Sequence, residues 1–431
     1  MLNNNISCLD NGHLGFSGVD TVAMAKKYGT PLYLFDENKI RENCRVYRRA
    51  VKKYFGTESL PLYASKAFCC KSMYRIVNDE GLGVDVVSGG ELYTALSTGF
   101  PAGKIFFHGN NKTESEINYA LDSKTGGFIV DNFDELYYLN KAAGERKMRQ
   151  KILLRVSPGI DPHTHKAIAT GSVDSKFGVP IKTGQALMFV KEALKCENLD
   201  VEGIHCHIGS QIFDSKPFTD AAKIMLDFVL EIKKETGYEA EKINLGGGIG
   251  VRYVDSDPEI SLDTIFSQIK KELDIMVSER NLKSPVFLFE LGRFICASAG
   301  MTLYTVGSSK TINGYKEYIN IDGGMSDNPR YALYGSQYTF YKADDAKAER
   351  IKKATVAGRC CESGDVLGED VTVPEFSRGD ILAVAVTGAY NYSMASNYNR
   401  IPRPAAVMLH NGKSRIIVKR ETYEDMVKNE I

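Results

Sequence analysis

Lys66 follows a short apolar run, residues 61–64, and its amine could do chemistry at the end of a strand. A lysine held in such a place can react with a carbonyl group and form a Schiff base. A solvated surface charge is the simpler alternative, because the chain carries 54 lysine and arginine residues. Polar residues and glycines that follow other predicted strands favour the positioned amine.

Three consecutive glycines, 246–248, follow another apolar segment, residues 242–245. Glycine lets the backbone approach an anion closely and point N–H groups toward it, so this run could cradle a phosphate. A flexible turn is the alternative. Gly292 and Arg293, after the segment 286–290, could add an N–H group and a guanidinium to the same anion.

Two histidines, His205 and His207, close the predicted strand 202–207. The alternation of side chains along a strand places both on the same side. A metal site is one alternative, but no third ligand with suitable local spacing follows them. The more economical interpretation is an imidazole stacked on a flat cofactor, with Ser210 bonded to the phosphate of that cofactor.

Glu290 ends a very apolar segment, residues 286–290. Burial raises the pKa of a carboxyl group, so an ionised Glu290 needs a cationic partner. The protonated nitrogen of a pyridine ring could be that partner, and a salt bridge with Arg155 or another cation inside the fold is an equal alternative. An amine, a phosphate cradle, a stacking imidazole and this carboxylate together describe a pyridoxal phosphate site.

Eight alternating strands and helices are expected to position these groups. The expected strands are 61–64, 83–87, 104–108, 127–130, 152–156, 202–207, 242–245 and 286–290. Helical patterns cover 36–55, 89–98, 113–122, 133–143, 183–195, 217–235 and 262–281. Parallel strands joined by crossover helices predict an α/β fold, a (β/α)8 TIM barrel. An open doubly wound sheet is the alternative, but it would gather its ligand at one switch point, whereas the candidate residues here follow many strands.

Short β-rich runs follow the last barrel strand and predict a second, all-β domain. They cover 301–306, 316–322, 354–358, 381–386, 405–409 and 414–418. The leading segment is expected to join them. The predicted organisation is therefore a barrel of residues 36–285 and a β-rich domain of residues 1–35 and 286–431.

The charge balance argues against some classes of partner. With 54 basic and 54 acidic residues the net charge is zero, so no global field favours nucleic acid or an anionic membrane. No signal-peptide pattern opens the chain and no apolar run reaches the length of a membrane span, which predicts a cytoplasmic protein. The nine cysteines lack CxxC spacing, which favours free thiols and no metal site.

The chain resembles the fold-type III, alanine-racemase-like decarboxylases that use pyridoxal phosphate, and most closely the diaminopimelate decarboxylases. The resemblance extends over nearly the full length and rests on eight motifs in the same order. These motifs are Tyr63–Ala67, Asp85–Leu92, Ser175–Gly178, His205–Gln211, Gly246–Gly250, Glu290–Arg293, Cys361–Asp365 and Gly388–Tyr390.

The resemblance implies a site for pyridoxal 5'-phosphate and a Greek-key, barrel-like second domain. Lys66 would bond the cofactor, His207 would stack on its ring and Glu290 would pair with the ring nitrogen. The other implied cofactor contacts are Asp85, Ser210, Gly246, Gly247, Gly248, Gly292, Arg293 and Tyr390.

The resemblance also implies a homodimer with shared active sites. Cys361 would be the proton donor and, with Glu362, would reach the site of the partner protomer, while Lys176 and Asp365 would form an ion pair across the interface. The implied substrate contacts are Arg293, Arg330, Tyr334, Glu362 and Tyr390. Two arginines can fork a carboxylate, and a glutamate can pair with an ammonium group.

The implied reaction is the conversion of meso-2,6-diaminopimelate to L-lysine and CO2. Alternatives within the fold are decarboxylases of ornithine, arginine, carboxynorspermidine or a D-amino acid. Ornithine has no carboxylate at its far end and would gain little from both arginines. A catalytically silent fold-mate that binds the cofactor is a further alternative, although it would have no chemical need of Lys66 or Cys361.

Overall fold

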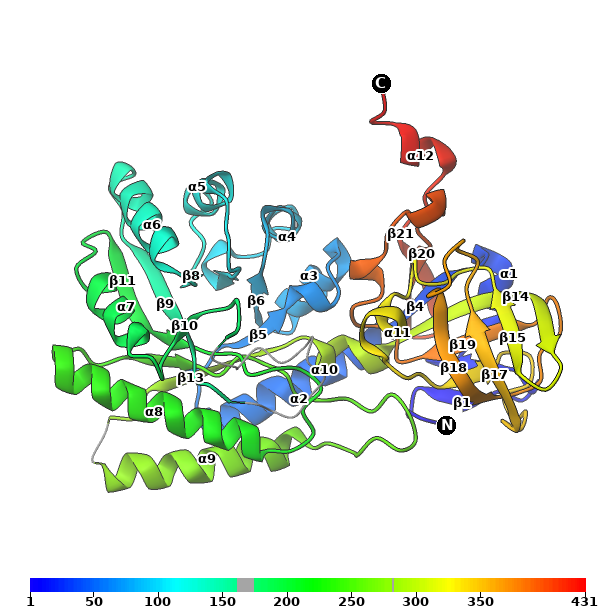
Figure 1. Cartoon of the computed structure of the whole chain (residues 1–431), viewed down its shortest axis with the longest axis horizontal. Helices are drawn as coiled ribbons and strands as arrows, with labels where there is room; N and C mark the ends of the chain where they lie inside the picture. The colour runs from blue at the N-terminus through cyan, green and yellow to red at the C-terminus, as the bar shows by residue number, and fades with distance from the viewer. Residues whose placement is uncertain (161–173, 281–282) are drawn as a thin grey trace. The chain divides into compact units, whose positions relative to one another are not determined.

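The computed structural model describes residues 1–160, 174–280 and 283–431, which form two compact units. The barrel unit comprises Cys44–Gly250 and Ile260–Gly292, and the β unit comprises Met1–Asn43, Val251–Glu259 and Arg293–Ile431 (Figure 1). The short segment Val251–Glu259 therefore belongs to the β unit although barrel segments precede and follow it in the chain.

The barrel unit contains a closed ring of eight parallel strands. The strands are β5 (Pro61–Ala64), β6 (Gly83–Val86), β7 (Ile105–Phe107), β8 (Gly127–Val130), β9 (Gln150–Ser157), β11 (Leu199–His205), β12 (Lys242–Asn244) and β13 (Val286–Leu291). The pairing of β8 with β9 and of β13 with β5 completes the ring. The predicted barrel is thus confirmed, and the open sheet is excluded. A two-residue strand, β10 (Val179–Pro180), extends the pairing beside β9.

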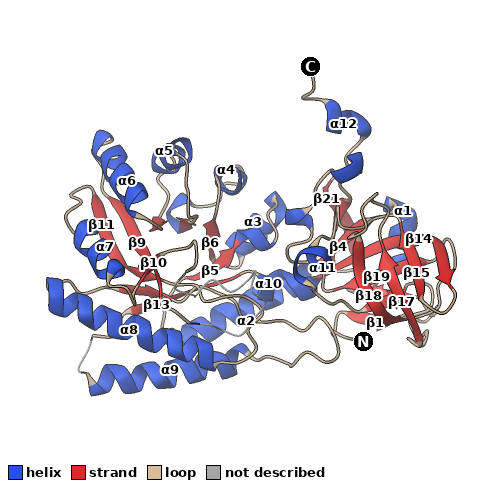
Figure 2. Cartoon of the chain, viewed as in Figure 1, coloured by secondary structure: helices blue, strands red, loops and turns tan. Residues whose placement is uncertain are grey.

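Helices follow the barrel strands and surround them (Figure 2). They are α2 (Glu37–Phe55), α3 (Lys71–Asp79), α4 (Gly89–Leu96), α5 (Glu114–Asp122), α6 (Phe133–Glu145), α7 (Gln185–Ala193), α8 (Lys216–Thr236) and α9 (Leu262–Glu279). Ser88, Thr113 and Asn132 cap α4, α5 and α6 through their side chains, which starts each helix soon after a strand. The expected helix 262–281 ends at Glu279, and residue 281 lies outside the described residues.

The interior of the barrel is filled by apolar side chains from several strands. One buried cluster consists of Leu62, Phe106, Ile129, Leu153 and Leu288. Because these residues fill the interior, the chemistry of a TIM barrel is confined to the ends of its strands.

An irregularity in β11 sets which polar side chains meet at the end of the barrel. The pairing of β11 with β9 shifts between Val201 and Gly203, and beyond it His205 pairs with Arg155 on one side and Asn244 on the other. A Cβ atom at Gly203 would lie 1.9 Å from a backbone oxygen of β12, so only glycine fits there. The register therefore brings the carboxyl ends of β9, β11 and β12 together as a polar surface.

The β unit is mainly a nine-stranded mixed sheet with a separate three-stranded sheet. Its strands are β1 (Ile6–Cys8), β2 (Leu14–Phe16), β3 (Val19–Asp20), β4 (Leu32–Asp36), β14 (Gly300–Ile312), β15 (Lys316–Ile321), β16 (Phe340–Lys342), β17 (Lys352–Ala357), β18 (Val366–Val373), β19 (Ile381–Ala385), β20 (Ala405–His410) and β21 (Lys413–Val418). Its helices are α1 (Thr21–Tyr28), α10 (Arg293–Cys296), α11 (Arg330–Tyr334) and α12 (Tyr423–Val427). From the leading segment, β4 pairs antiparallel with β14 and parallel with β20.

Five of the described strands of the β unit escaped the sequence prediction: β1, β2 and β3, which are only two or three residues long, and β16 and β18. β16 is only three residues long, and β18 contains Gly368, Glu369 and Asp370, which weaken the apolar pattern of a strand.

Among the described residues, no helix is both long and apolar enough to cross a membrane.

Candidate active site

Lys66 lies in a single 3-10 turn, η1 (Ser65–Ala67), that directly follows β5. Its side chain is exposed within the chain, whereas Ser65 is fully buried. The Ser65 hydroxyl donates to Oε2 of Glu91 at 2.6 Å, and the N–H of Val87 donates to the same oxygen at 2.9 Å. Glu91 therefore ties the ends of β5 and β6 together and fixes the turn that presents the Lys66 amine.

Gly292, at the end of β13, allows that strand to approach the same turn. A Cβ atom at this position would lie 2.9 Å from the Ala64 oxygen and 3.0 Å from the Cβ of Ala67. The backbone of Gly292 thus packs directly beneath the Lys66 turn, a contact that a larger residue would disturb.

Glu290 is a buried carboxylate surrounded by three donors from other strands of the barrel. Its Oε1 accepts from Nδ2 of Asn244 at 2.7 Å and lies 2.9 Å from Nε2 of His108. Its Oε2 lies 3.2 Å from Nε2 of His205. The two imidazole rings contact each other edge to face, with centroids 5.0 Å apart. Every carboxylate oxygen of Glu290 is therefore engaged from inside the barrel.

This arrangement keeps Glu290 ionised. Burial alone would raise the pKa of Glu290, but its electrostatic interactions and hydrogen bonds with His108 and His205 outweigh burial and hold the pKa well below its usual value. Burial lowers the pKa of both imidazoles, that of His205 to about 4. Neutral imidazoles that donate Nε2–H to an ionised carboxylate satisfy both shifts and the short contacts.

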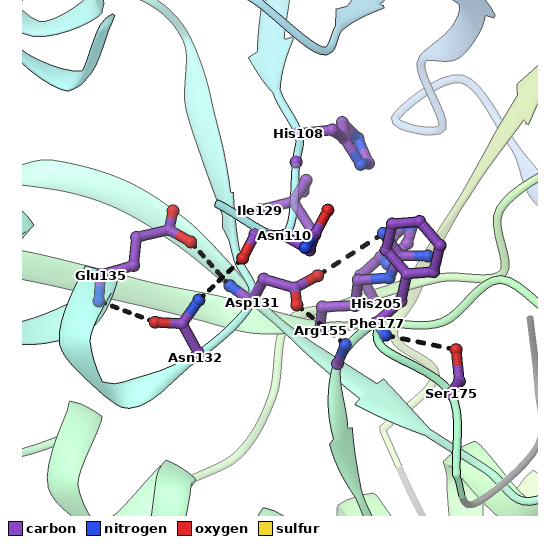
Figure 3. Close-up of polar contacts among 12 residues, drawn as sticks. His108, Asn110, Ile129, Asp131, Asn132, Glu135, Arg155, Ser175, Phe177 and His205 are labelled. Atoms are coloured by element: carbon purple, nitrogen blue, oxygen red, sulfur yellow. Dashed lines mark hydrogen bonds and ion pairs between the residues drawn. The ribbon is translucent and has the colours of Figure 1, made fainter. Parts of the chain in front are cut away.

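Arg155 has a different partner from Glu290. Nη1 of Arg155 lies 3.6 Å from Oδ1 of Asp131, and its guanidinium stacks over the ring of Phe177 at 4.4 Å (Figure 3). Oδ2 of Asp131 accepts from the N–H of Gly178 at 3.0 Å. A direct salt bridge between Arg155 and Glu290, one of the two alternatives from the sequence, was wrong, because Asp131 pairs with the guanidinium and two histidines and an amide surround the carboxylate.

The glycine run is shaped by close backbone approach. Oδ1 of Asn244 accepts from the N–H of Gly246 at 2.9 Å, and Nδ1 of His207 accepts from the N–H of Gly247 at 3.2 Å. A Cβ atom at Gly247 would lie 2.1 Å from the Glu290 oxygen, and one at Gly248 would lie 2.2 Å from the Gly209 oxygen. Only glycine fits this path, as an anion cradle requires.

His207 and Ser210 lie beyond the end of β11, which stops at His205. The predicted strand 202–207 therefore ends two residues earlier than expected, and strand alternation does not extend to His207. His205 reaches Glu290, whereas the half-buried His207 contacts the glycine run. Ser210 is also half-buried, close in sequence to Gly209.

Asp85 lies next to the last residue of β6 and is a buried carboxyl group. Burial raises its pKa well above the usual value, and the charge of Glu290 raises it further, against the opposing charge of Lys66. Its Oδ1 has no hydrogen-bond partner within the described part of the chain. A buried polar atom without a partner is rare and fits a group that binds there.

In the β unit, Arg293 and Arg330 converge on one tyrosine. Nη1 of Arg293 donates to the phenol oxygen of Tyr253 at 2.7 Å, and Nη1 of Arg330 donates to the same oxygen at 2.8 Å. The guanidinium carbons lie 4.8 Å and 5.8 Å from the centroid of the Tyr390 ring. The structure thus brings together three of the residues expected to hold anionic groups.

Cys361 and Glu362 are exposed in a turn of the β unit. The N–H of Cys361 donates to Oδ1 of Asn399 at 2.6 Å. Asp365 is buried at the end of this turn, where it accepts from the N–H groups of Met325 at 2.5 Å and Cys360 at 2.6 Å. The carboxylate of Asp365 therefore shapes the turn that presents Cys361.

The remaining expected residues are distributed over both units. Tyr334 is half-buried at the end of α11 in the β unit. Lys176 is exposed in the barrel unit, with its amine 4.9 Å from the ring centroid of Phe177. The ion pair expected between Lys176 and Asp365 of two protomers stays a prediction.

Sequence reasoning missed three residues that the structure places at these groups. His108 ends a predicted strand and could have been found from that position. Asn244 lies two residues before the glycine run and could have been found in the same way. Tyr253 carries no signal in its local sequence. His108, His205 and Glu290 also have ligand atoms within 4.8 Å of one another, close enough for a metal ion. The contacts of both imidazoles with the Glu290 carboxylate account for that closeness.

Comparisons with known proteins agree with this geometry. Residues 37–297 match the family model described as the pyridoxal binding domain of pyridoxal-dependent decarboxylases. The chain is 46% identical over 412 residues to the diaminopimelate decarboxylase of Bacillus methanolicus, an alignment that covers 96% of this chain and 95% of the relative. It is 44% identical to that of Bacillus subtilis, covering 97% and 95%. A crystal structure of the M. jannaschii diaminopimelate decarboxylase with L-lysine matches with a TM-score of 0.92 at 35% identity, covering 100% of this chain and 99% of that one.

The depressed pKa of His205 predicts a pH-dependent stability. An unfolded histidine has a pKa of about 6.5, so the unfolded state binds more protons than the folded state as the pH falls toward 4, and stability falls with it. Replacing His205 with Gln keeps an N–H donor for Glu290 but removes the titration. Between about pH 7 and pH 5 the wild type should lose about 2 kcal/mol more of its free energy of unfolding than His205→Gln loses.

Urea unfolding at the two pH values measures this difference. If His205→Gln and the wild type lose the same free energy, His205 does not titrate against Glu290 as described.

Proposed function

We propose roles for individual residues from the premise that the chain belongs to the diaminopimelate decarboxylases, within the pyridoxal-dependent decarboxylase family. The enzyme uses pyridoxal 5'-phosphate and converts meso-2,6-diaminopimelate to L-lysine and CO2, the last step of lysine biosynthesis. The observation that carries the proposal is the ionised Glu290 at the same end of the barrel as Lys66.

The residues of the barrel unit fit this cofactor. The bound cofactor supplies an electron-accepting ring for the electron pair that remains when the carboxylate leaves as CO2. Lys66 holds it covalently through its amine, and Glu290 accepts a hydrogen bond from the ring nitrogen and so favours the protonated form of that nitrogen. His207 would stack on the ring, and Asp85, whose Oδ1 has no hydrogen-bond partner among the described residues, would contact the cofactor.

The phosphate is held by backbone and side-chain donors. Gly246, Gly247 and Gly248 follow a path that only glycine can take, which would let a bound anion approach this stretch of backbone closely. The hydroxyl of Ser210 and the N–H of Gly292 add donors, and the β unit contributes Arg293 and Tyr390. Such a cradle fixes the cofactor independently of its covalent bond to Lys66.

Substrate choice rests on the far end of diaminopimelate, which carries its own amino and carboxylate groups. Arg293 and Arg330 are buried and converge on one point, which suits a forked contact with that carboxylate. Glu362 is exposed and pairs with the ammonium group, and Tyr334 and Tyr390 line the same subsite. Ornithine lacks the carboxylate that both arginines favour.

Cys361 donates the proton that replaces the lost carboxylate, and it acts on the site of the partner protomer in a homodimer. Its exposure in the single chain supports this assignment, because a proton donor for another protomer must lie on the surface. We also place the enzyme in the cytoplasm, since all nine cysteines are free thiols and such thiols persist in a reducing compartment.

Substitution of Lys66 tests the proposed attachment. Lys66→Ala should fold, lose covalent cofactor and lose nearly all formation of L-lysine from meso-diaminopimelate, because the amine is exposed and not part of the core. Borohydride treatment followed by peptide mass spectrometry locates the bound lysine in the wild type. Lys71→Ala, at the exposed start of α3, is the matched control and should retain the cofactor. Cofactor trapped on any other lysine would contradict the assignment.

An assay of CO2 release distinguishes the rival substrates. The wild type should release CO2 from meso-diaminopimelate much faster than from ornithine, arginine, carboxynorspermidine or D-lysine. Faster release from any of these four would replace the proposed substrate, and no release from any would favour a silent fold-mate.

Mixed dimers test the shared site. If each site takes Lys66 from one protomer and Cys361 from the other, mixing Lys66→Ala with Cys361→Ala chains should restore activity. Random pairing makes about half the dimers mixed, and each mixed dimer has one intact site, so recovery should approach about a quarter of wild type.

The control mixes Lys66→Ala with Glu290→Gln. Both residues lie in the barrel unit, so every site of a mixed dimer keeps one defect and activity should not return. Lys66→Ala and Cys361→Ala chains that exchange subunits yet stay inactive would contradict the shared site.

A further inference from the structure

Tyr253 lies between two arginines and is the shared acceptor of both. Its phenol oxygen accepts from Nη1 of Arg293 at 2.7 Å and from Nη1 of Arg330 at 2.8 Å. Its ring also lies under both guanidinium groups, with centroid distances of 5.8 Å and 5.2 Å. One side chain therefore contacts both cations through its oxygen and its ring.

The two guanidinium groups need such a residue because they are buried and carry like charge. Arg293 is 6% exposed and Arg330 is 4% exposed. Arg330 forms no ion pair with a carboxylate among the described residues, and its Nε has no hydrogen-bond partner there. Buried like charges repel strongly, so they stay close only if neighbouring groups hold them.

The phenol responds to this surrounding charge. Burial raises the pKa of Tyr253, but the charges of Arg293 and Arg330 and their hydrogen bonds outweigh it and lower the pKa below the ordinary value. The two guanidinium groups thus favour the ionised form of the phenol, in keeping with the two N–H groups that donate to its oxygen.

Tyr253 is itself held firmly by its backbone. Its N–H donates to Oδ2 of Asp257 at 2.8 Å, and its carbonyl accepts from the hydroxyl of Thr339 at 2.9 Å. The ring of Tyr338 packs edge-on against it at 5.6 Å. A side chain locked in this way can define where its partners lie.

We propose that Tyr253 is a positioning residue that holds Arg293 and Arg330 together so that both meet the carboxylate at the far end of the substrate. The inference rests on the proposed function, which gives the two arginines that carboxylate. Tyr253 thereby contributes to the selection of diaminopimelate over amines that lack the group, without touching the reacting carbon.

Binding of two related ligands to the holoenzyme tests this role. L-lysine carries the carboxylate of the far end, and cadaverine has the same two amines without it. Tyr253→Phe removes one oxygen and should weaken L-lysine binding about ten-fold, because two charge-assisted hydrogen bonds are lost, while cadaverine binding changes less than about two-fold. Titration calorimetry with each ligand measures both affinities without turnover.

Tyr338→Phe is the matched control. It removes the same atom from the adjacent ring, whose hydroxyl faces Asn391 at 3.4 Å, and should leave both affinities unchanged. If Tyr253→Phe weakens both ligands equally, or if Tyr338→Phe reproduces its effect, Tyr253 supports only the local fold and the inference is overturned.

Arg330→Ala tests the proposed carboxylate subsite separately from the role of Tyr253. If Arg330→Ala leaves L-lysine binding intact, the carboxylate subsite itself is wrong. If Arg330→Ala weakens L-lysine binding and Tyr253→Phe does not, the subsite stands and the role of Tyr253 is wrong. Should Tyr253→Phe fail to fold, Asp257→Asn can replace it, because it weakens the hydrogen bond to the backbone N–H of Tyr253. Weaker binding of L-lysine alone would then support the inference, and equal weakening of both ligands would overturn it.

Discussion

A carboxylate can remain ionised inside a protein only if donors replace the water that it loses. Glu290 meets that constraint without a permanent cation, since two neutral imidazoles and one amide from other strands surround it. The donors are fixed by the fold and carry no net charge of their own, so the negative charge of Glu290 is free to favour a protonated group that binds. The residues at the carboxyl ends of the barrel strands hold these donors in place around the Glu290 carboxylate.

Closure of the barrel brings the donors to Glu290 together. The four side chains come from different strands: His108 directly follows β7, and His205, Asn244 and Glu290 lie in β11, β12 and β13. Only a closed ring of strands brings the ends of all four strands around one point. Gly203 sets the register of β11 that points His205 inward, and Gly247 lets the following loop pass against the Glu290 backbone. The same loop has the shape of an anion cradle. The Glu290 carboxylate and the proposed phosphate site therefore depend on the same strand ends.

The sequence predicted the fold class because the barrel strands are short apolar runs and amphipathic helical patterns lie between them. It singled out Lys66, the glycine run and Glu290 as candidates because their residue types are unusual at strand ends. It could not predict the partners of Glu290, because His108 and Glu290 lie far apart in the chain and pair only through the barrel. Tyr253 was hidden for the same reason, since the segment that carries it packs with the β unit although its neighbours in sequence belong to the barrel.

The charge of Glu290 is the central claim, and Glu290→Gln tests it most directly because the amide keeps the shape of the side chain. A neutral amide no longer favours the protonated ring nitrogen, so kcat should fall by about a hundred-fold or more. The Kd for pyridoxal phosphate should change by less than about ten-fold, because the phosphate cradle and Lys66 are untouched. Both quantities can be measured on the same purified variant. Unchanged turnover, or a loss of cofactor affinity as large as the loss of kcat, would contradict the account.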